Sequence, residues 1–147
     1  LPILKKTLRN YDGLIVISAI LCTVVILSVL NLMVFSYGTH IEKIEVTKTE
    51  LKSGESSVIK IWIRNNEPEH VGILRVKTTI ISENQELIVT NKEISIKSLS
   101  KFSTSNPVFV EIQADDQISE NNHKINIILI NNEHEIDRKE IYLKTIS

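Results

Sequence analysis

The chain has 147 residues, of which 42% are hydrophobic and 24% are charged, and its formal net charge is −1. This length accommodates one domain of about a hundred residues and one shorter segment, and it excludes two separate cores. A clustered basic face is typical of nucleic-acid binders. The near-neutral balance shows no such cluster, so we expect no nucleic-acid partner.

The first thirteen residues are short and basic. Lys5, Lys6 and Arg9 accompany a single acidic residue, Asp12. Basic residues beside an apolar segment stay on the cytoplasmic side of a membrane. We therefore expect residues 1–13 to be cytoplasmic, with these three side chains setting the topology.

A run without any charged residue extends from Gly13 to Thr39. At 1.5 Å per helical residue, two dozen residues cover about 36 Å, which exceeds a hydrocarbon core of about 30 Å. We predict one transmembrane helix over residues 14–37, which makes the lipid bilayer a partner and the chain a single-pass protein of the cell membrane. The alternative is a secretory signal peptide, whose apolar region is shorter and is followed by a small-residue cleavage site that this sequence lacks.

Small and polar side chains interrupt the predicted membrane helix. Such residues let neighbouring helices approach closely or exchange hydrogen bonds in lipid. The candidates for helix–helix contact are Ser18, Ala19, Cys22, Thr23, Ser28 and Asn31. The alternative is that Ser and Thr bond to the carbonyl four residues earlier and that Asn31 lies near the interface.

From Ile41 onward, apolar residues alternate with polar ones, which is typical of half-buried strands. Turn residues rich in Asn, Asp, Ser and Gly separate these runs. The expected strands cover residues 44–46, 58–63, 74–80, 87–89, 94–96, 108–112, 125–129 and 136–146. We predict an all-β, Ig-like antiparallel sandwich over residues 41–147, on the extracytoplasmic side of the membrane.

The turn at residues 51–55 (LKSGE), the strand over 58–63 and the segment 64–68 (RNNEP) follow one another. This order resembles the Ig-like adhesion-type (CARDB-like) modules of archaeal and bacterial surface proteins, in which a Gly-Glu turn precedes the second strand and an Asn follows it. The resemblance covers roughly residues 42–146. Antibody-type domains differ, because this segment has no cysteine and Trp62 lies on its second strand. The resemblance implies binding or spacing rather than catalysis.

We find no set of residues suited to catalysis, a cofactor or a metal. The four histidines are His40, His70, His123 and His134. They are widely separated, with none at a ligand spacing, so we expect a non-enzymatic protein without a cofactor.

Trp62 and Phe109 stand out, because each is out of phase with the Ile or Val face of its own strand. They are either part of a second, small core or contacts for a partner protein.

The combination of an anchor and a β-domain without reactive groups predicts an accessory subunit of a larger membrane or cell-envelope complex. By analogy, such subunits accompany archaeal membrane enzymes such as ammonia monooxygenase. Its partners would be other membrane subunits or envelope proteins. The alternative is a surface-appendage component, resembling a pilin or an archaellum stator protein. Asp12-Gly13 before the apolar run is similar to a prepilin cleavage site, whereas Lys5, Lys6 and Arg9 do not suit a filament core.

Overall fold

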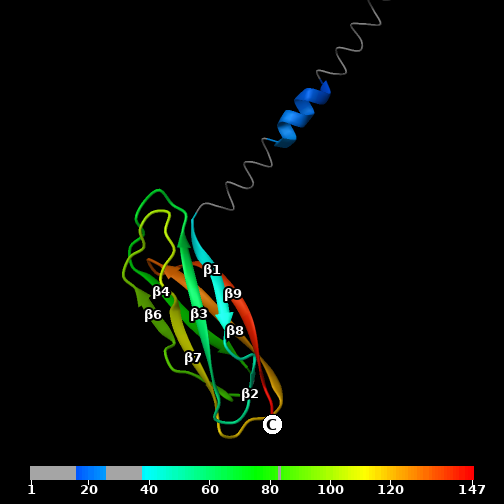
Figure 1. Cartoon of the computed structure of the whole chain (residues 1–147), viewed down its shortest axis with the longest axis vertical. Coiled ribbons are helices and arrows are strands. Elements are labelled where there is room, and N and C mark those ends of the chain that lie inside the picture. Colours follow the sequence, from blue (N-terminus) through cyan, green and yellow to red (C-terminus); the bar gives the residue numbers. More distant parts are fainter. Residues whose placement is uncertain (1–15, 26–37, 83) are drawn as a thin grey trace, which may run out of the picture. The chain divides into compact units, whose positions relative to one another are not determined.

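The computed structural model describes residues 16–25, 38–82 and 84–147, and the chain divides into two units, Leu1–Tyr37 and Gly38–Ser147 (Figure 1). In the first unit, residues 16–25 are helical and all of them are exposed. Within the described ranges, no helix is both long enough and apolar enough to cross a membrane. Most of the predicted span over 14–37 lies outside these ranges, as do Lys5, Lys6 and Arg9.

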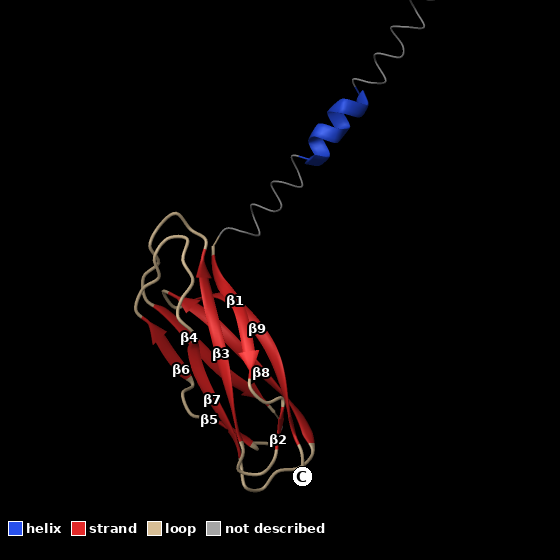
Figure 2. Cartoon of the chain, in the orientation of Figure 1, coloured by secondary structure: helices blue, strands red, loops and turns tan. Residues whose placement is uncertain are grey.

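The second unit is a sandwich of two β-sheets, which confirms the all-β prediction (Figure 2). Its strands are β1 (Thr39–Val46), β2 (Glu50–Leu51), β3 (Ser56–Asn65), β4 (Leu74–Ile81), β5 (Leu87–Val89), β6 (Glu93–Ile96), β7 (Val108–Ala114), β8 (Asn121–Asn131) and β9 (His134–Thr145). The β3 sheet has the order β1-β3-β7-β5, and the β8 sheet has the order β2-β9-β8-β4-β6. The parallel pair of β2 and β9 is the exception among otherwise antiparallel ladders.

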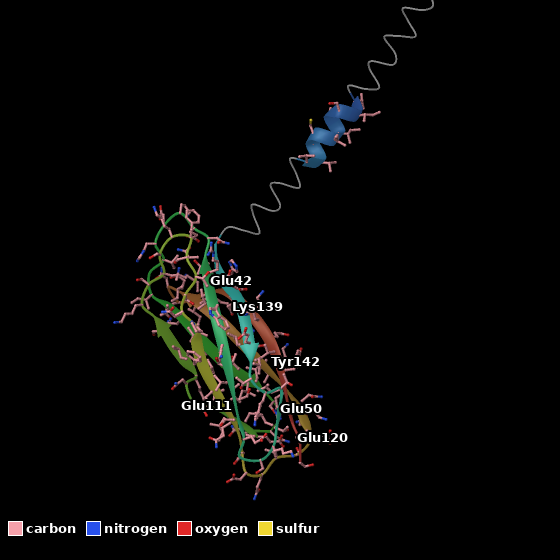
Figure 3. All side chains as sticks on the ribbon, in the orientation of Figure 1. Glu42, Glu50, Glu111, Glu120, Lys139 and Tyr142 are labelled. Carbon is pink, nitrogen blue, oxygen red and sulfur yellow. The ribbon has the colours of Figure 1, made fainter. Side chains whose placement is uncertain are left out.

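Alternation decides which side chains enter the core. On β3, Ile59, Ile61 and Ile63 are fully buried between the sheets, and the intervening residues are only half-buried. Burying an isoleucine side chain stabilises a fold by about 1.5–3 kcal/mol. Charged side chains such as Glu50 and Glu111 lie on the outside of the sandwich (Figure 3).

The Gly-Glu turn before β3 is held by Glu55. Its carboxylate accepts the backbone N–H of Lys52 at 3.1 Å and the Lys48 ammonium at 3.1 Å, while its own N–H donates to the Lys52 carbonyl at 3.0 Å. Gly54 adopts a φ of +72°, a conformation that costs a residue with a Cβ more than glycine. The turn residues of the sequence motif therefore have a local structural role.

Asn65, the asparagine at the end of β3, ties two connections to the sandwich. Its side chain is fully buried, and its amide nitrogen donates to the carbonyls of Glu69 (2.9 Å), Ser100 (3.1 Å) and Leu99 (3.3 Å). Its oxygen accepts the backbone N–H of Glu67 at 2.9 Å. One side chain thus fixes both the β3–β4 loop and the β6–β7 connection, which explains an Asn at this position.

The two sheets are joined on one side, where β1 of the β3 sheet lies beside β9 of the β8 sheet (Figure 1). The register of β1 against β3 shifts between Ile41 and Lys43, leaving Glu42 without a paired residue. The Ile41 N–H donates instead to the Asp137 carboxylate of β9 at 2.7 Å. This bond closes the β1–β9 side and covers part of an edge strand that would otherwise expose its backbone.

Candidate functional site

Trp62 and Phe109 lie on the outer face of the β3 sheet, on neighbouring strands. Phe109 pairs with Lys60, so Trp62, two residues further along β3, is its diagonal neighbour. Trp62 is half-buried, and the Lys43 ammonium on β1 lies 5.1 Å from its ring centroid, within the range of a cation–π contact. Phe109 is 54% exposed. The tryptophan is therefore partly packed, whereas the phenylalanine ring is largely free.

One ion pair on this face lies on β1. Lys43 forms an ion pair with Glu45 at 2.5 Å, and this hydrogen bond lowers the pKa of the Glu45 carboxyl. Both groups are exposed, so their pairing adds little to stability. Two further charged side chains lie on the same face beside Phe109: its cross-strand partner Lys60 and, on β7, Glu111.

A buried polar network lies at the other end of the sandwich and is centred on His123 of β8. This side chain is fully buried, with Nδ1 at 2.9 Å from the Ser82 hydroxyl and Nε2 at 2.9 Å from the Thr145 hydroxyl. The Thr145 hydroxyl donates to the Ser119 carbonyl at 2.7 Å, so it accepts from Nε2–H. Both ring nitrogens are therefore engaged by hydroxyl groups, Nδ1 by that of Ser82 and Nε2 by that of Thr145.

Glu86 completes the network beside Nε2, where its Oε2 lies 3.3 Å from the ring nitrogen. Its other oxygen, Oε1, accepts the hydroxyl of Ser119 at 2.5 Å and the backbone N–H of Ser119 at 3.2 Å. The Ser119 hydroxyl is the main cause that lowers the pKa of the Glu86 carboxyl. Ser82, His123 and Glu86 are the residue types of a catalytic triad of nucleophile, base and carboxylate. The imidazole of His123 is fully buried, however, and both of its nitrogens are already hydrogen-bonded. The network therefore has a structural role, in which it ties β8, β9 and the segment after β4 together at this end of the sandwich.

This network was not predicted from the sequence. In the sequence His123 is one of four separated histidines, whereas the fold brings it to Glu86 and Thr145, which are 59 residues apart in the chain. One signal was available, since His123 is in phase with Ile125 and Ile127 on the inner face of β8. A histidine at a core position has to find hydrogen-bond partners when it is buried.

The depressed pKa of Glu86 predicts a pH dependence. A carboxylate with a lowered pKa in the folded state stabilises the fold above its ordinary value of 4.5, and this stabilisation is lost as the pH falls through the lowered value. We expect unfolding midpoints in urea to fall less between pH 7 and pH 3 in Glu86→Gln than in the wild type. Glu111→Gln, an exposed control, should follow the wild type. Parallel curves for wild type and Glu86→Gln would contradict this prediction.

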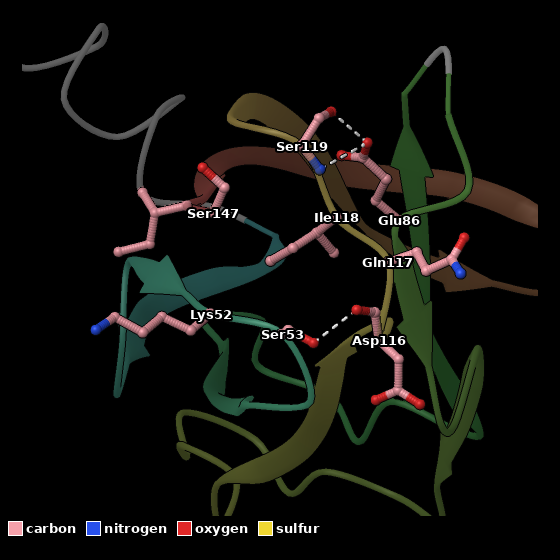
Figure 4. A pocket seen from close by; sticks show the side chains of 9 residues that line it. Lys52, Ser53, Glu86, Asp116, Gln117, Ile118, Ser119 and Ser147 are labelled. Atoms are coloured by element: carbon pink, nitrogen blue, oxygen red, sulfur yellow. Dashed lines mark hydrogen bonds between the residues drawn. The ribbon is translucent and has the colours of Figure 1, made fainter.

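A shallow depression of about 760 Å³ adjoins the network (Figure 4). Glu86 and Ser119 form one wall, and Lys52 and Ser53 lie opposite, with the Ser53 hydroxyl donating to the Asp116 carbonyl at 2.7 Å. Within the described residues, no group of three or more His, Cys, Asp or Glu side chains is arranged to hold a metal ion. The depression is open, and the Glu86 carboxylate on its wall is already engaged with Ser119.

Four of the six predicted helix-contact residues lie in the described helix: Ser18, Ala19, Cys22 and Thr23. The Thr23 hydroxyl donates to the Ala19 carbonyl at 2.8 Å, as the alternative of intrahelical bonding predicts for this residue. Cys22 is a free, exposed thiol. Ser28 and Asn31 lie outside the described residues.

Neither protein-family models nor curated protein sequences gave a match to the chain. Among solved structures, the native conformation of E. coli alpha-2-macroglobulin matches 70% of this chain with 6% of its own, at a TM-score of 0.53 and 14% identity. The Pseudomonas fluorescens alkylpurine DNA glycosylase AlkC, solved with DNA containing an abasic site analog, matches 79% of this chain with 32% of its own, at 0.50 and 11%. This chain thus spans a small part of either protein.

The cupredoxin domain of amoB from Nitrosocaldus yellowstonii also matches, over 74% of this chain and 87% of its own, with a TM-score of 0.48 and 8% identity. At a TM-score below 0.5 this likeness carries no weight for function. Identities of 14% and 11% to the two larger proteins show a common fold and nothing about activity. The chain is therefore similar to known proteins as an Ig-like β-sandwich, and the CARDB-like resemblance stays a prediction.

Proposed function

We propose that the chain is a membrane-anchored, non-catalytic accessory subunit of a larger membrane or cell-envelope complex, and that its sandwich makes the protein contacts. The observation that carries the proposal is the uncharged run from Gly13 to Thr39, which ends where β1 begins. A segment of this length and composition suits a bilayer. It would attach the sandwich directly to the membrane surface.

The described part of the helix supports an apolar environment. Its large apolar side chains are 55–66% exposed and, at 100° per residue, share one half of the helix: Val16, Ile17, Ile20, Leu21, Val24 and Val25. An uncharged helix with an exposed apolar face of this width is stable where lipid or other apolar segments cover that face. Ser18 and Ala19 are small enough to let a neighbouring helix approach.

Large apolar side chains are exposed on both outer faces of the sandwich, including Tyr142 (61%) and Ile81 (54%) on the β8 sheet. Ion pairs cross the β8 sheet, where Lys124 bonds to Glu140 and Arg75 bonds to Glu93. On the β3 sheet, Phe109 and Ile88 expose 54% and 53% of their surface. Exposed apolar side chains of this size favour a partner contact.

The orientation follows from Lys5, Lys6 and Arg9, which would hold the N-terminus in the cytoplasm and place the sandwich outside. In this orientation the sandwich would cover part of the outer surface of the complex. An archaeal membrane enzyme such as ammonia monooxygenase is one assembly of this kind. The absence of a reactive set from the sequence motivates the non-catalytic role.

The test is gentle detergent extraction of the native membrane followed by native mass measurement of the intact assembly. We expect the chain to co-migrate with other membrane subunits in fixed stoichiometry. A purely monomeric chain would contradict the proposal. The measured mass also decides the alternative, because a chain that begins at Leu14 would support a processed pilin, and one that retains Lys5 would exclude it.

A further inference from the structure

The side of the sandwich opposite the β1–β9 contact is open. There the β3 sheet ends in β5, which has three residues, whereas its neighbour β7 has seven. The β5–β7 ladder covers Ile112 to Ala114, and it is extended by a bond from the Thr90 N–H to the Glu111 carbonyl. After Thr90 the chain crosses to the β8 sheet and forms β6. The first residues of β7 therefore have no strand beside them on this edge.

The backbone of Phe109 faces the open edge. The Ala114 N–H bonds to Glu55 on the β3 side, whereas the Glu111 carbonyl bonds to Thr90 on the β5 side. Backbone groups alternate along a strand, so Phe109, two residues before Glu111, directs its N–H and C=O to the same side as Glu111. No described residue bonds to these two groups on that side. The N–H and C=O of Phe109 are therefore free to pair with the backbone of an added strand, at the position where a longer β5 would have paired.

A groove of about 700 Å³ lies along this edge, between β6 and the start of β7. Ile94 and Ile96 of β6 line one wall, and Val108 and Phe109 of β7 line the other. Among the described residues that line the groove, none is charged, although 24% of the chain is. Serine, threonine and asparagine side chains form its rim. Such a lining cannot offset the burial of a charged side chain.

We propose that this groove binds an extended, uncharged segment of a partner polypeptide, which adds to the β3 sheet as a short strand beside β7. The segment takes the place that a longer β5 would fill, and its backbone pairs with the N–H and C=O of Phe109. Its alternate residues are apolar, because one side of an added strand meets Ile96 and Val108 while the other side meets the Phe109 ring. The inference rests on the proposed function, for which it specifies the contact.

The experiment selects from a display library of random heptapeptides on the full chain in detergent. We expect enriched peptides with apolar residues at alternate positions and no charge between them. Backbone N-methylation of an enriched peptide at alternate residues should weaken its binding at least tenfold in one of the two registers. Amide hydrogen exchange at Phe109 should slow when the peptide binds. A library without enrichment, or peptides that leave the exchange at Phe109 unchanged, would overturn the inference.

Two variants separate the backbone contact from the ring. Phe109→Ala removes the ring and keeps the backbone N–H. Phe109→Pro removes both the ring and the N–H. Because this N–H makes no ladder bond to β3, we expect the fold to tolerate proline at this position. We expect Phe109→Pro to bind about three- to tenfold more weakly than Phe109→Ala, the effect of one hydrogen bond. Equal affinities would overturn strand addition. Tyr142→Ala, on the β8 sheet, should bind as the wild type does.

The same experiments distinguish other molecules that could occupy the groove. Self-association in ultracentrifugation that Phe109→Pro abolishes would show a second copy of the chain in the groove and overturn a foreign partner. If peptides bind as expected but the native chain is monomeric in the membrane extract, the proposed function fails while the groove remains a peptide site. If native partners exist but the library gives no enrichment, the accessory role stands and this groove is not the contact.

Discussion

Replacing Asn65 by aspartate is expected to lower the free energy of unfolding of the sandwich by about 3–5 kcal/mol. The amide nitrogen of Asn65 faces three carbonyl oxygens, those of Glu69, Leu99 and Ser100. A carboxylate of the same shape has no hydrogen to donate to them, and its negative charge would be buried without a partner. Because a domain of this size is stable by about 5–15 kcal/mol, the loss is a large share of the total.

The measurement is urea unfolding of the full chain in detergent, followed by the fluorescence of Trp62, the one tryptophan of the chain. Asn66→Asp is the matched control. The Asn66 side-chain oxygen accepts from the Arg64 guanidinium at 2.9 Å, which an aspartate oxygen does equally well. We expect the control to stay within about 0.5 kcal/mol of the wild type. A similar loss in both variants would show that Asn65 does not tie the two connections as described.

Replacing His123 by alanine is expected to destabilise the sandwich by about 3–4 kcal/mol. The change empties the space of a fully buried ring. It also leaves the hydroxyl of Ser82 without its partner on Nδ1, and it leaves the hydroxyl of Thr145 and the carboxylate of Glu86 without the donor on Nε2. A cavity and unsatisfied buried groups add to each other, because the neighbouring strands can collapse into the space only in part.

The same urea titration measures this loss, and His134→Ala is its control. His134 is exposed at the start of β9, so we expect its replacement to change the free energy of unfolding by no more than about 0.5 kcal/mol. The contrast tests the network rather than the residue type. A His123→Ala variant as stable as the His134→Ala variant would mean that Ser82, Thr145 and Glu86 find other partners.

The sequence alone predicted the class of the fold, because alternation is local. Ile59, Ile61 and Ile63 fall on one face of any extended strand, so their burial follows from their spacing. Strand ends were less well determined. The predicted strand over 125–129 extends to Asn121–Asn131, since pairing on both sides of β8 keeps polar residues in the ladder.

The candidate sites were predicted in part. Phase along β3 and β7 correctly distinguished Trp62 and Phe109 from the core residues of their strands, although it did not show that Trp62 packs against Lys43 while Phe109 stays exposed. Those environments depend on which strands are neighbours. The open edge beside Phe109 likewise depends on where β5 ends. A short apolar run such as residues 87–89 does not by itself predict where the strand stops pairing with β7.

The sequence by itself therefore determined the two-part organisation of the chain, with its uncharged run before an alternating β-domain, and the faces of the main strands. Only the tertiary structure decided that Asn65 reaches the carbonyls of Leu99 and Ser100, and that His123 meets Ser82 and Thr145. The physical reason is that periodicity sets the direction of a side chain within its own strand. Contacts between residues tens of positions apart depend on strand order and register, which arise when the two sheets assemble.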